Sequence, residues 1–413
     1  MQILMGLVGP LFLMGIAWAL SENRRAIRWR TILPVFALQA GLGALVLYVP
    51  FGHTLLLTIS HGVQAVIDSA NAGISFLFGG LAGDRMHELF GNGGFVFAIQ
   101  VLPVIVFFSS LISVLYYLGI MRWVIQLIGG AIHRLAGTSY SESMSASANI
   151  FVGQTEAPLV VRPFIERMTR SELFAVMVGG LASVAGSTLA GYAALGVELK
   201  YLIAASFMAA PGGLLMAKLM VPETDTPEHH DRILKSDPDE PVANVIDAAA
   251  TGASAGVRLA LNVGGMLLAF ISLIAVINML FGVVGGWFGY DGLTLQTLLG
   301  YLFAPLAFLI GVPWQDAIAA GSFIGQKIVL NEFVAYVQFA EHSAGLSEHT
   351  RAIVTFALCG FANLSSIAIL MGGLGGMAPS RRHEIARLGM RAIVAGTLSN
   401  LMSATLAGLF IAL

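Results

Sequence analysis

The stretch NIFVGQTEAPLVVRPFI, residues 149–165, decides the fold of this chain. It is largely apolar, but Gly153 and Pro158 interrupt it and a carboxylate, Glu156, lies within it. A helix that spans a bilayer needs about 17–25 consecutive, mainly apolar residues, and this stretch offers no such run. It predicts a re-entrant hairpin or a broken helix instead, because irregular backbone is tolerated at membrane depth where protein or a water-filled cavity surrounds it.

The composition of the whole chain places this stretch in a membrane protein. Of 413 residues, 57% are hydrophobic and only 11% are charged, whereas ordinary soluble domains carry about 25% charged residues. The net charge of −2 provides no basic face for phosphates and excludes nucleic acid as a partner. A single cysteine, Cys359, excludes an intrachain disulfide and a cysteine-rich metal site. The lipid bilayer is therefore the expected surroundings.

Apolar segments of spanning length lie on both sides of this stretch. The expected fold is an all-α membrane protein with eight transmembrane helices and two re-entrant helical hairpins in an inverted repeat, with interfacial helices. Residues 51–92 are amphipathic and predict a periplasmic surface helix or a short helical pair. The predicted spans are 2–20, 31–50, 93–119, 172–194, 199–220, 258–286, 350–372 and 391–412, and the hairpins are 138–163 and 312–340.

Basic residues support this topology through the positive-inside rule. Arginine clusters at 24–30 and 381–391 fall on the same predicted side. That side is the cytoplasm, so both termini are expected in the periplasm of a bacterial inner membrane. The outer side receives only Arg85, Lys200, Lys327 and Arg351.

Two parts of the chain repeat one pattern. Gly153-Gln-Thr-Glu156 has a counterpart in Gly325-Gln-Lys, which Asn331-Glu332 follows. A helix interrupted by small residues comes after each, at 179–188 and at 359–366. The topology brings one hairpin in from the cytoplasm and the other from the periplasm. Such inverted repeats are typical of secondary transporters, whose binding site lies near the midplane where the broken segments meet.

The carboxylates of Glu156 and Glu332 are the main candidates for ligand contacts. A carboxylate at the bilayer centre costs at least ~2.5 kcal/mol on insertion scales, and such residues tend to face a cavity; a structural hydrogen bond is the alternative role. An ionised carboxylate only accepts hydrogen bonds, which suits a neutral ligand rich in N–H or O–H donors. Gln154 and Thr155 adjoin Glu156, and a glutamine can both donate and accept along the edge of a nucleobase.

Two further groups of polar residues lie at the interruptions. Asn363 and Ser366, after Phe361, offer an amide and a hydroxyl to a ribose, although interhelical packing is the alternative role for a serine. Candidate cation ligands come from the first half, because broken helices expose oxygen atoms that sodium prefers. They are the side chains of Asn149 and Ser183 and the carbonyls of Val152 and Val184.

At this point the motifs resemble the concentrative nucleoside transporter family, and most closely its bacterial sodium-coupled members. The resemblance rests on GQTEAPLVVRPFI (153–165), NEFVAY (331–336) and CGFANLSSIAI (359–369), and it covers most of the chain from about residue 93. It implies a homotrimer in which a mobile transport domain carries the substrate past a scaffold by an elevator-like displacement.

The resemblance also implies roles for individual residues. Gln154, Thr155 and Glu156 would contact the base, Phe361 would pack near it, and Glu332, Asn363 and Ser366 would hold the ribose. Sodium would lie among Asn149, Val152, Ser183 and Val184. Thr188 departs from the family pattern, which leads us to expect an apolar residue in the base pocket there. The sequence therefore leaves open the preference between purine and pyrimidine nucleosides.

The expected domain organisation follows from the same resemblance. It comprises N-terminal scaffold spans (1–120), the first half of the transport domain (121–220), a cytoplasmic connector (221–257), a scaffold span (258–290) and the second half of the transport domain (291–413).

We expect sodium-coupled symport of nucleosides into the cell, with sodium as the co-transported ion. Proton coupling is the alternative within the same class, in which Glu156 or Glu332 would titrate. A passive channel would need a continuous polar stripe along several spans, whereas the polar residues cluster at the hairpin tips. An intramembrane enzyme would need a catalytic pair or a HExxH motif, which the spans lack.

Overall fold

Every regular element among the described residues is a helix. The computed structural model describes residues 2–83, 85–90, 95–227, 242–289 and 292–413. Helices before and between the two halves of the repeat are α1 (Gln2–Ala19), α2 (Trp29–Leu47), α3 (Pro50–Phe78), α4 (Arg85–Phe90), α5 (Phe97–Gln100), α6 (Leu102–Tyr117) and α12 (Val245–Trp287). Short 3-10 turns lie at Arg24–Ala26, Gly79–Ala82, Ser343–Gly345 and Pro379–Arg381.

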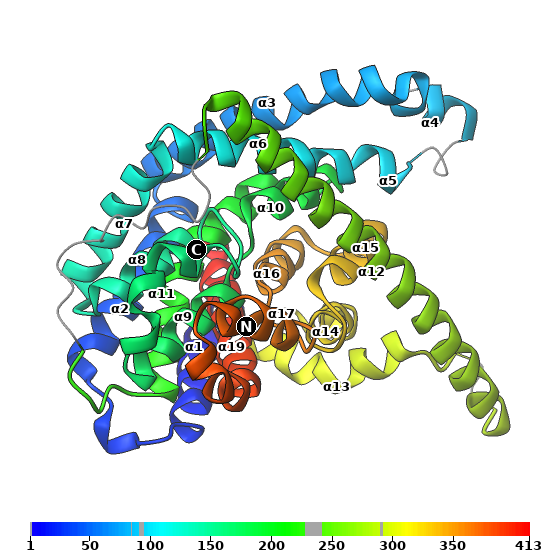
Figure 1. Cartoon of the computed structure of the whole chain (residues 1–413). Helices are drawn as coiled ribbons and strands as arrows, with labels where there is room; N and C mark the ends of the chain where they lie inside the picture. Colours follow the sequence, from blue (N-terminus) through cyan, green and yellow to red (C-terminus); the bar gives the residue numbers. More distant parts are fainter. Residues whose placement is uncertain (1, 84, 91–94, 228–241, 290–291) are drawn as a thin grey trace.

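Helix α12 runs along the outside of the molecule with α6 packed against it (Figure 1). Gly252 and Gly256 lie four residues apart on the face of α12 that meets α6, and a Cβ atom at either position would collide with α6. Such spacing of small residues allows membrane helices to approach closely. Ser110 and Ser113 of α6 use this proximity to donate hydrogen bonds to carbonyls of α12, at 2.9 and 2.8 Å.

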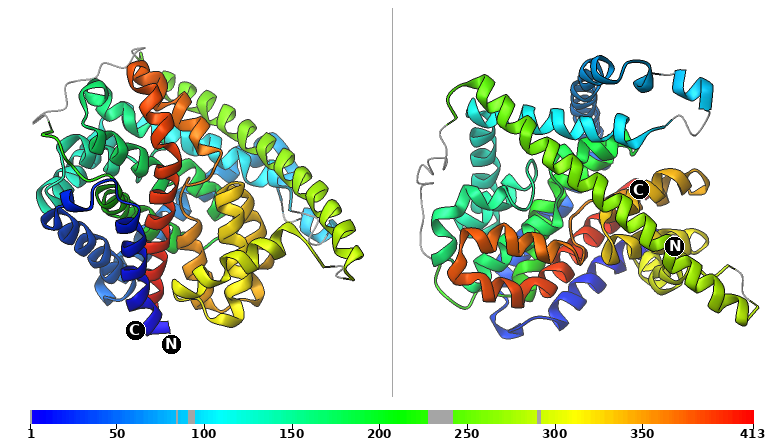
Figure 2. Two further views of the ribbon diagram at one scale, coloured as in Figure 1. Left: turned by 90° about the horizontal axis from the view of Figure 1, so that it is seen from below. Right: turned by 45° about the vertical axis from the view of Figure 1, so that its right-hand side comes forward.

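The first and last helices of the chain lie side by side (Figure 2). A Cβ atom at Gly6 would contact Leu409, and one at Gly9 would contact Thr405, so α1 runs antiparallel to α19 (Arg382–Ala412). The two termini consequently lie at the same end of the molecule, in agreement with an even number of membrane crossings between them.

The first half of the repeat begins with an amphipathic helix and contains the first hairpin. Gly137, with φ of +64°, ends the helix that precedes the hairpin, and Ser139 starts the next one through a capping box with Glu142. Thr169 and Glu172 form the same capping box at the start of the broken helix. The elements are α7 (Ile120–Ala136), α8 (Tyr140–Ala148), η4 (Ala157–Arg167), α9 (Arg170–Ala182), α10 (Gly186–Ala194) and α11 (Leu199–Met220).

The second half repeats this order. Asn331 caps the second arm of its hairpin and Ser347 caps its broken helix. The elements are α13 (Leu295–Leu309), α14 (Trp314–Val329), α15 (Glu332–His342), α16 (Glu348–Leu358), α17 (Ser366–Gly372), α18 (Leu374–Met377) and the final helix α19. The two carboxylates singled out in the sequence hold equivalent places, because Glu156 precedes η4 and Glu332 is the first residue of α15.

The centre of the molecule is formed by helices of both halves. In the most apolar 18-residue window, 94% of the residues of α11 are buried, compared with 11% for α12. Helix α11 packs on α9 and α19, so the broken helices are enclosed by protein on most sides. The exposed apolar surface of α12 and α3 is left for lipid or for another copy of the chain.

The helix lengths and hydropathies confirm an all-helical membrane protein. By these two criteria, seven helices of the described chain could cross a membrane, or eight if the pair α13–α14, which is bent by 116°, counts as one span. Two predicted spans do not pass this test, because α1 is short and the 350–372 span is broken between α16 and α17. The 33-residue helical stretch Pro50–Ala82 does pass it, so its expected place at the membrane surface stays a prediction.

Three details of the sequence prediction need correction. Helix α12 begins at Val245 and has 43 residues, which makes it about 64 Å long against a hydrocarbon core of about 30 Å. Helix α13 was not predicted, because 15 residues are fewer than a span needs. Lys327 is not an outer-loop cation, because it lies within α14 and only 1% of its surface is exposed.

Candidate functional site

A cavity lies where the hairpin tips, the helix breaks and α12 meet. It encloses about 730 Å³ of space that is partly open to solvent. All eight residues predicted to bind substrate line it: Gln154, Thr155, Glu156, Thr188, Glu332, Phe361, Asn363 and Ser366. The structure thus brings together residues from both halves of the repeat that are up to about two hundred positions apart in the sequence.

Glu332 is held in place by three groups at one end of the cavity. It occupies the first turn of α15, where the helix dipole stabilises a negative charge. The Nδ2 atom of Asn363 donates to one carboxylate oxygen at 2.7 Å, and the hydroxyl of Tyr192 donates to the other at 3.3 Å. The ring of Tyr192 stacks on Tyr336, with 4.2 Å between the centroids. The carboxylate is therefore fixed in orientation and still lines the cavity.

The amide of Asn363 is fixed by the residues that follow it. Its Oδ1 atom accepts hydrogen bonds from the backbone N–H of Ser366 at 3.0 Å and from the hydroxyl of Ser365 at 2.7 Å. Because Oδ1 is occupied in this way, Nδ2 must point toward Glu332. The hydroxyl of Ser366 donates to the carbonyl of Phe361 at 2.5 Å, which closes the turn between α16 and α17.

Glu156 lies at the opposite side of the cavity and is exposed within it. Its Oε2 atom accepts a hydrogen bond from the backbone N–H of Gly153 at 2.7 Å, which tightens the hairpin tip. The side chain of Gln154 reaches across to the other half, where its Nε2 atom donates to the hydroxyl of Ser366 at 3.5 Å. Its Oε1 atom is buried and has no hydrogen-bond partner. That end of the cavity therefore presents two acceptors, a carboxylate and a free amide oxygen.

The remaining wall of the cavity is apolar and was missed by the sequence analysis. It is contributed by one face of α12, whose residues Leu259, Val263, Met266 and Leu267 line the cavity. In the sequence these residues are indistinguishable from lipid-facing positions of a spanning helix. Phe361 is half-buried beside this wall, and Thr188 adds a hydroxyl-bearing side chain from α10.

The residues predicted to bind sodium lie behind the first hairpin tip. Asn149 ends α8 and Ser183 ends α9, and both are buried. The Nδ2 atom of Asn149 donates to the carbonyl of Ser145 at 2.9 Å, whereas its Oδ1 atom has no hydrogen-bond partner. A Cβ atom at Gly179 would lie 3.2 Å from this amide, so Asn149 rests directly on the last turn of α9.

This donor set fits a hard cation. Helix ends leave carbonyl oxygens without intrahelical partners, and an orphaned amide oxygen adds a neutral ligand. Val152 and Val184 are buried in the same region, where the backbone N–H of Gly186 donates to the carbonyl of Phe151 at 2.9 Å and joins the hairpin tip to α10. Within the described residues there is no cluster of three or more His, Cys, Asp and Glu, so a site for a transition metal has no support there.

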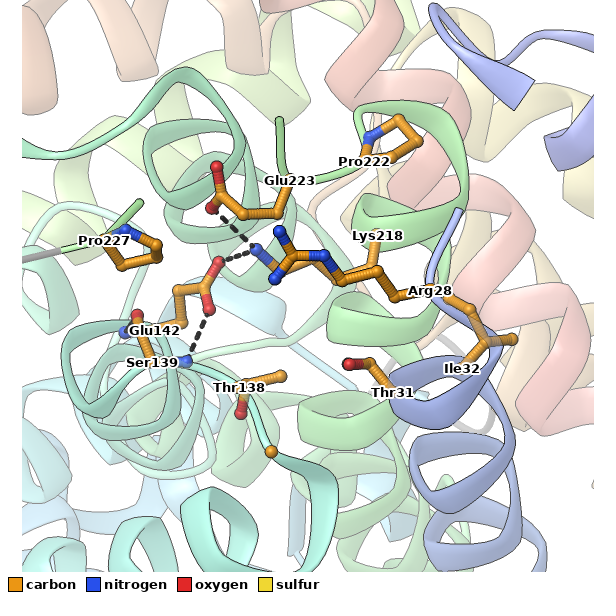
Figure 3. A pocket seen from close by; sticks show the side chains of 11 residues that line it. Arg28, Thr31, Ile32, Thr138, Ser139, Glu142, Lys218, Pro222, Glu223 and Pro227 are labelled. Atoms are coloured by element: carbon orange, nitrogen blue, oxygen red, sulfur yellow. Dashed lines mark hydrogen bonds and ion pairs between the residues drawn. The ribbon is translucent and has the colours of Figure 1, made fainter. Parts of the chain in front are cut away.

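A second cavity lies at the base of the first hairpin and is lined by charged residues (Figure 3). Lys218 of α11 forms ion pairs there with Glu142 of α8 and, at 3.6 Å, with Glu223. It also donates a hydrogen bond to the hydroxyl of Ser171 at 2.9 Å. Arg28 also lines this cavity, and its side chain lies beside that of Lys218 in Figure 3. No residue predicted to bind substrate or sodium lines this cavity, and its polar contacts join α8 to α9 and α11.

Comparison with known proteins identifies relatives over the whole length. Models of the C-terminus and N-terminus of Na⁺-dependent nucleoside transporters match residues 201–408 and 8–81, and a nucleoside-recognition gate model matches residues 98–198. The nucleoside permease NupC of Helicobacter pylori is 54% identical over 99% of this chain and 98% of its own.

Two solved structures of the transporter CNTnw are similar throughout. Its inward-facing substrate-bound state is 60% identical, with a TM-score of 0.95 over 99% of this chain and 98% of the other. A double variant in an outward-facing state is 59% identical, with a TM-score of 0.97 over 100% of this chain and 99% of the other.

Proposed function

The chain belongs to the family of Na⁺-dependent nucleoside transporters, a family of membrane proteins that are not enzymes, and on that premise we propose that it imports nucleosides by symport with sodium. The observation that carries the proposal is the single cavity that both carboxylates line, one from each half of the repeat. A nucleoside has hydrogen-bond donors at its ribose and on its base, so two separated groups of acceptors match its two ends.

The ribose fits the end of the cavity formed by the second half. Glu332 accepts hydrogen bonds there, and Asn363 and Ser366 are held rigidly beside it. Two neighbouring hydroxyls of a ribose can donate to the carboxylate and to the hydroxyl oxygen of Ser366, while they accept from the second N–H of Asn363. A carboxylate whose orientation is already fixed costs little additional entropy on binding.

The base fits the end formed by the first half. The carboxylate of Glu156 and the free Oε1 atom of Gln154 are both acceptors, which suits the N–H groups on the edge of a base. Thr155 lies beside them, and Phe361 and the apolar face of α12 offer surfaces for the faces of the ring. Thr188 supports tolerance of more than one base, because its hydroxyl can donate or accept.

Sodium coupling is supported by the orphaned Oδ1 atom of Asn149. An amide oxygen does not titrate, so it suits a metal cation and not a proton, with Val152, Ser183 and Val184 as the other ligands. The chain would work as a homotrimer in the bacterial inner membrane, with both termini periplasmic. Its transport domain (121–220 and 291–413) would move past the scaffold (1–120 and 258–290), and the connector (221–257) would lie in the cytoplasm.

The test is uptake of radiolabelled uridine and adenosine into proteoliposomes that contain the purified protein. We expect accumulation above the external concentration with an inward sodium gradient, and none when choline replaces sodium or when an ionophore collapses the gradient. Equal uptake with a proton gradient alone would contradict sodium coupling.

Two variants separate the two proposed sites. Glu332→Gln is expected to abolish nucleoside binding measured by calorimetry, whereas Glu341→Gln, an exposed carboxylate on the same helix, should bind normally. Asn149→Ala is expected to raise the sodium concentration for half-maximal uptake, and Ser147→Ala, which alters a buried hydroxyl of the same helix that bonds to Ser143, should not. Unchanged sodium dependence in Asn149→Ala would contradict the assigned cation site.

A further inference from the structure

Lys327 is a buried cation in the centre of the second half. It lies near the end of α14, with 1% of its surface exposed. Its ammonium group donates to the carbonyl of Ala357 at 2.8 Å and to the Oδ1 atom of Asn400 at 2.6 Å. Burying an ammonium group is costly unless it is compensated, so this lysine requires an explanation beyond packing.

Asn400 connects the lysine to both broken helices. Its Nδ2 atom donates to the carbonyl of Ala182, the last residue of α9, at 2.6 Å, and to the carbonyl of Cys359, which ends α16, at 2.9 Å. A Cβ atom at position 360 would overlap this amide, so Gly360 provides the room. The ends of both broken helices therefore meet at one lysine–asparagine pair.

Carbonyls at the end of a helix carry partial negative charge and attract cations. In transporters with broken helices, such ends commonly coordinate the coupling ion. The end of α16 already has a cation close by, because the ammonium of Lys327 bonds to Ala357 within its last turn.

The two halves differ in what their hairpins bring to the broken helices. In the first half, the end of α8 brings Asn149 to the last turn of α9, and Oδ1 of this residue has no partner. In the second half, the end of α14 brings the ammonium of Lys327 to the last turn of α16. One half thus offers oxygen atoms to a cation, and the other already contains a positive charge.

We propose that Lys327 is a built-in cation that replaces a second sodium ion in the second half, so that each nucleoside is transported with one sodium ion. The proposal rests on the sodium-coupled function proposed above. Among the described residues, Lys327 donates hydrogen bonds to Ala357 and Asn400 and to no side chain that lines the cavity, so it is a positioning residue that holds the second break in shape throughout the cycle. The charges of Glu156 and Glu332 are then balanced by one ammonium group and one sodium ion.

The first test uses the unmodified protein. Parallel uptake of radioactive sodium and radiolabelled uridine into proteoliposomes at a clamped membrane potential gives the ratio of the two fluxes. We expect one sodium ion per nucleoside and a hyperbolic dependence on sodium. A ratio of two would overturn the inference while leaving sodium-coupled transport intact, and uridine uptake without any sodium flux would overturn both.

The second test removes the charge. In Lys327→Ala the carbonyl of Ala357 and the amide of Asn400 lose their cation, so we expect uridine uptake to fall. Uptake should recover when ethylammonium is added or when the sodium concentration is raised. The dependence of uptake on sodium should then be sigmoidal. Lys200→Ala, which removes a partly exposed lysine, is the matched control and should keep the hyperbolic curve. A Lys327→Gln variant with wild-type uptake and a hyperbolic sodium curve would overturn the inference. If the variants fail to fold, the flux ratio measured on the unmodified protein decides.

Discussion

Tyr192 supports the carboxylate that we assign to the ribose. Its hydroxyl lies 3.3 Å from Glu332, and its ring is fully buried between Phe333 and Tyr336. A hydrogen bond to a charged group contributes about 1.5–3 kcal/mol, although at this length the lower end applies. Tyr192→Phe keeps the ring and removes only the hydroxyl. We expect about tenfold weaker nucleoside binding in calorimetry, with the sodium dependence of uptake unchanged.

The matched control is Tyr336→Phe. Its hydroxyl donates to the carbonyl of Thr355 at 2.8 Å and not to the carboxylate of Glu332. That variant is expected to lower the melting temperature and to leave nucleoside affinity near the wild-type value. Equal losses of affinity in both variants would indicate a general loosening of the aromatic cluster and would contradict the specific role of Tyr192.

At the scale of elements, the base of the first hairpin depends on one buried lysine. Lys218 of α11 neutralises Glu142 of α8 and Glu223, and only 8% of its side chain is exposed. Removal of one partner of a buried ion pair costs about 3–5 kcal/mol, because a charge is left uncompensated. Lys218→Met is expected to lower the thermal stability of the detergent-solubilised protein strongly.

The double variant Lys218→Met/Glu142→Gln tests the cause of that loss. If the uncompensated carboxylate is responsible, the second substitution should restore part of the stability. Lys200→Met, which alters a more exposed lysine of the same helix, should change the melting temperature little. No recovery in the double variant would contradict the electrostatic explanation.

A second electrostatic link joins the turn after α1 to both halves. Glu22 accepts hydrogen bonds from Arg170 at the start of α9 and forms an ion pair with Arg391 of α19 at 3.0 Å. Arg170 holds the pKa of Glu22 below its usual value of 4.5, mainly through its hydrogen bond. A lowered carboxyl pKa stabilises the fold above the unfolded pKa, and this contribution disappears as the pH falls through the folded pKa.

We therefore expect a pH-dependent effect of Glu22→Gln. At pH 7 the variant should be less stable than the wild type by about 0.3–1 kcal/mol, since the group is partly exposed. The difference in melting temperature between the two proteins should shrink as the pH is lowered below about 4.5. A difference that is constant from pH 7 to pH 3.5 would contradict the assignment.

Elements that are marked by a glycine, a proline or an isolated carboxylate within an apolar run could be predicted from the sequence. Gly153, Pro158 and the isolated carboxylates interrupt apolar runs, which is why both hairpins and most of the cavity residues could be named in advance. Thr188 was named only through the family resemblance. The apolar wall from α12 could not be predicted, because Val263 and its neighbours resemble the apolar residues of any spanning helix. The roles of Lys327 and Asn400 were missed as well. Their contacts join residues 73 positions apart in the chain, and only tertiary structure brings these together.

At the scale of the whole molecule, the cavity combines parts that we expect to move relative to one another. Its polar residues come from the hairpins and broken helices, and its apolar wall comes from α12, which packs on α6. A smooth apolar wall makes no directional bonds, so substrate held by the polar side can pass along it at little cost. Helix α10 also packs on α6. If the transport domain moves as one body, α10 must slide along α6.

A disulfide between α6 and α10 tests this motion directly. A Cβ atom at Gly191 would lie 3.4 Å from the Cγ1 atom of Ile105, which is one bond beyond the Cβ atom of that residue. Two cysteines at these positions would therefore lie close to the Cβ separation of about 3.5–4.5 Å that a disulfide needs. Cys359, the only native cysteine, is buried and should not interfere. In Ile105→Cys/Gly191→Cys we expect oxidation to stop uridine uptake while calorimetric binding persists, and reduction to restore uptake. The two single variants, treated with oxidant in the same way, should transport at rates that oxidation does not change. Undiminished uptake by a fully cross-linked protein would show that α6 and α10 travel together, and the boundary between scaffold and transport domain would then have to lie elsewhere.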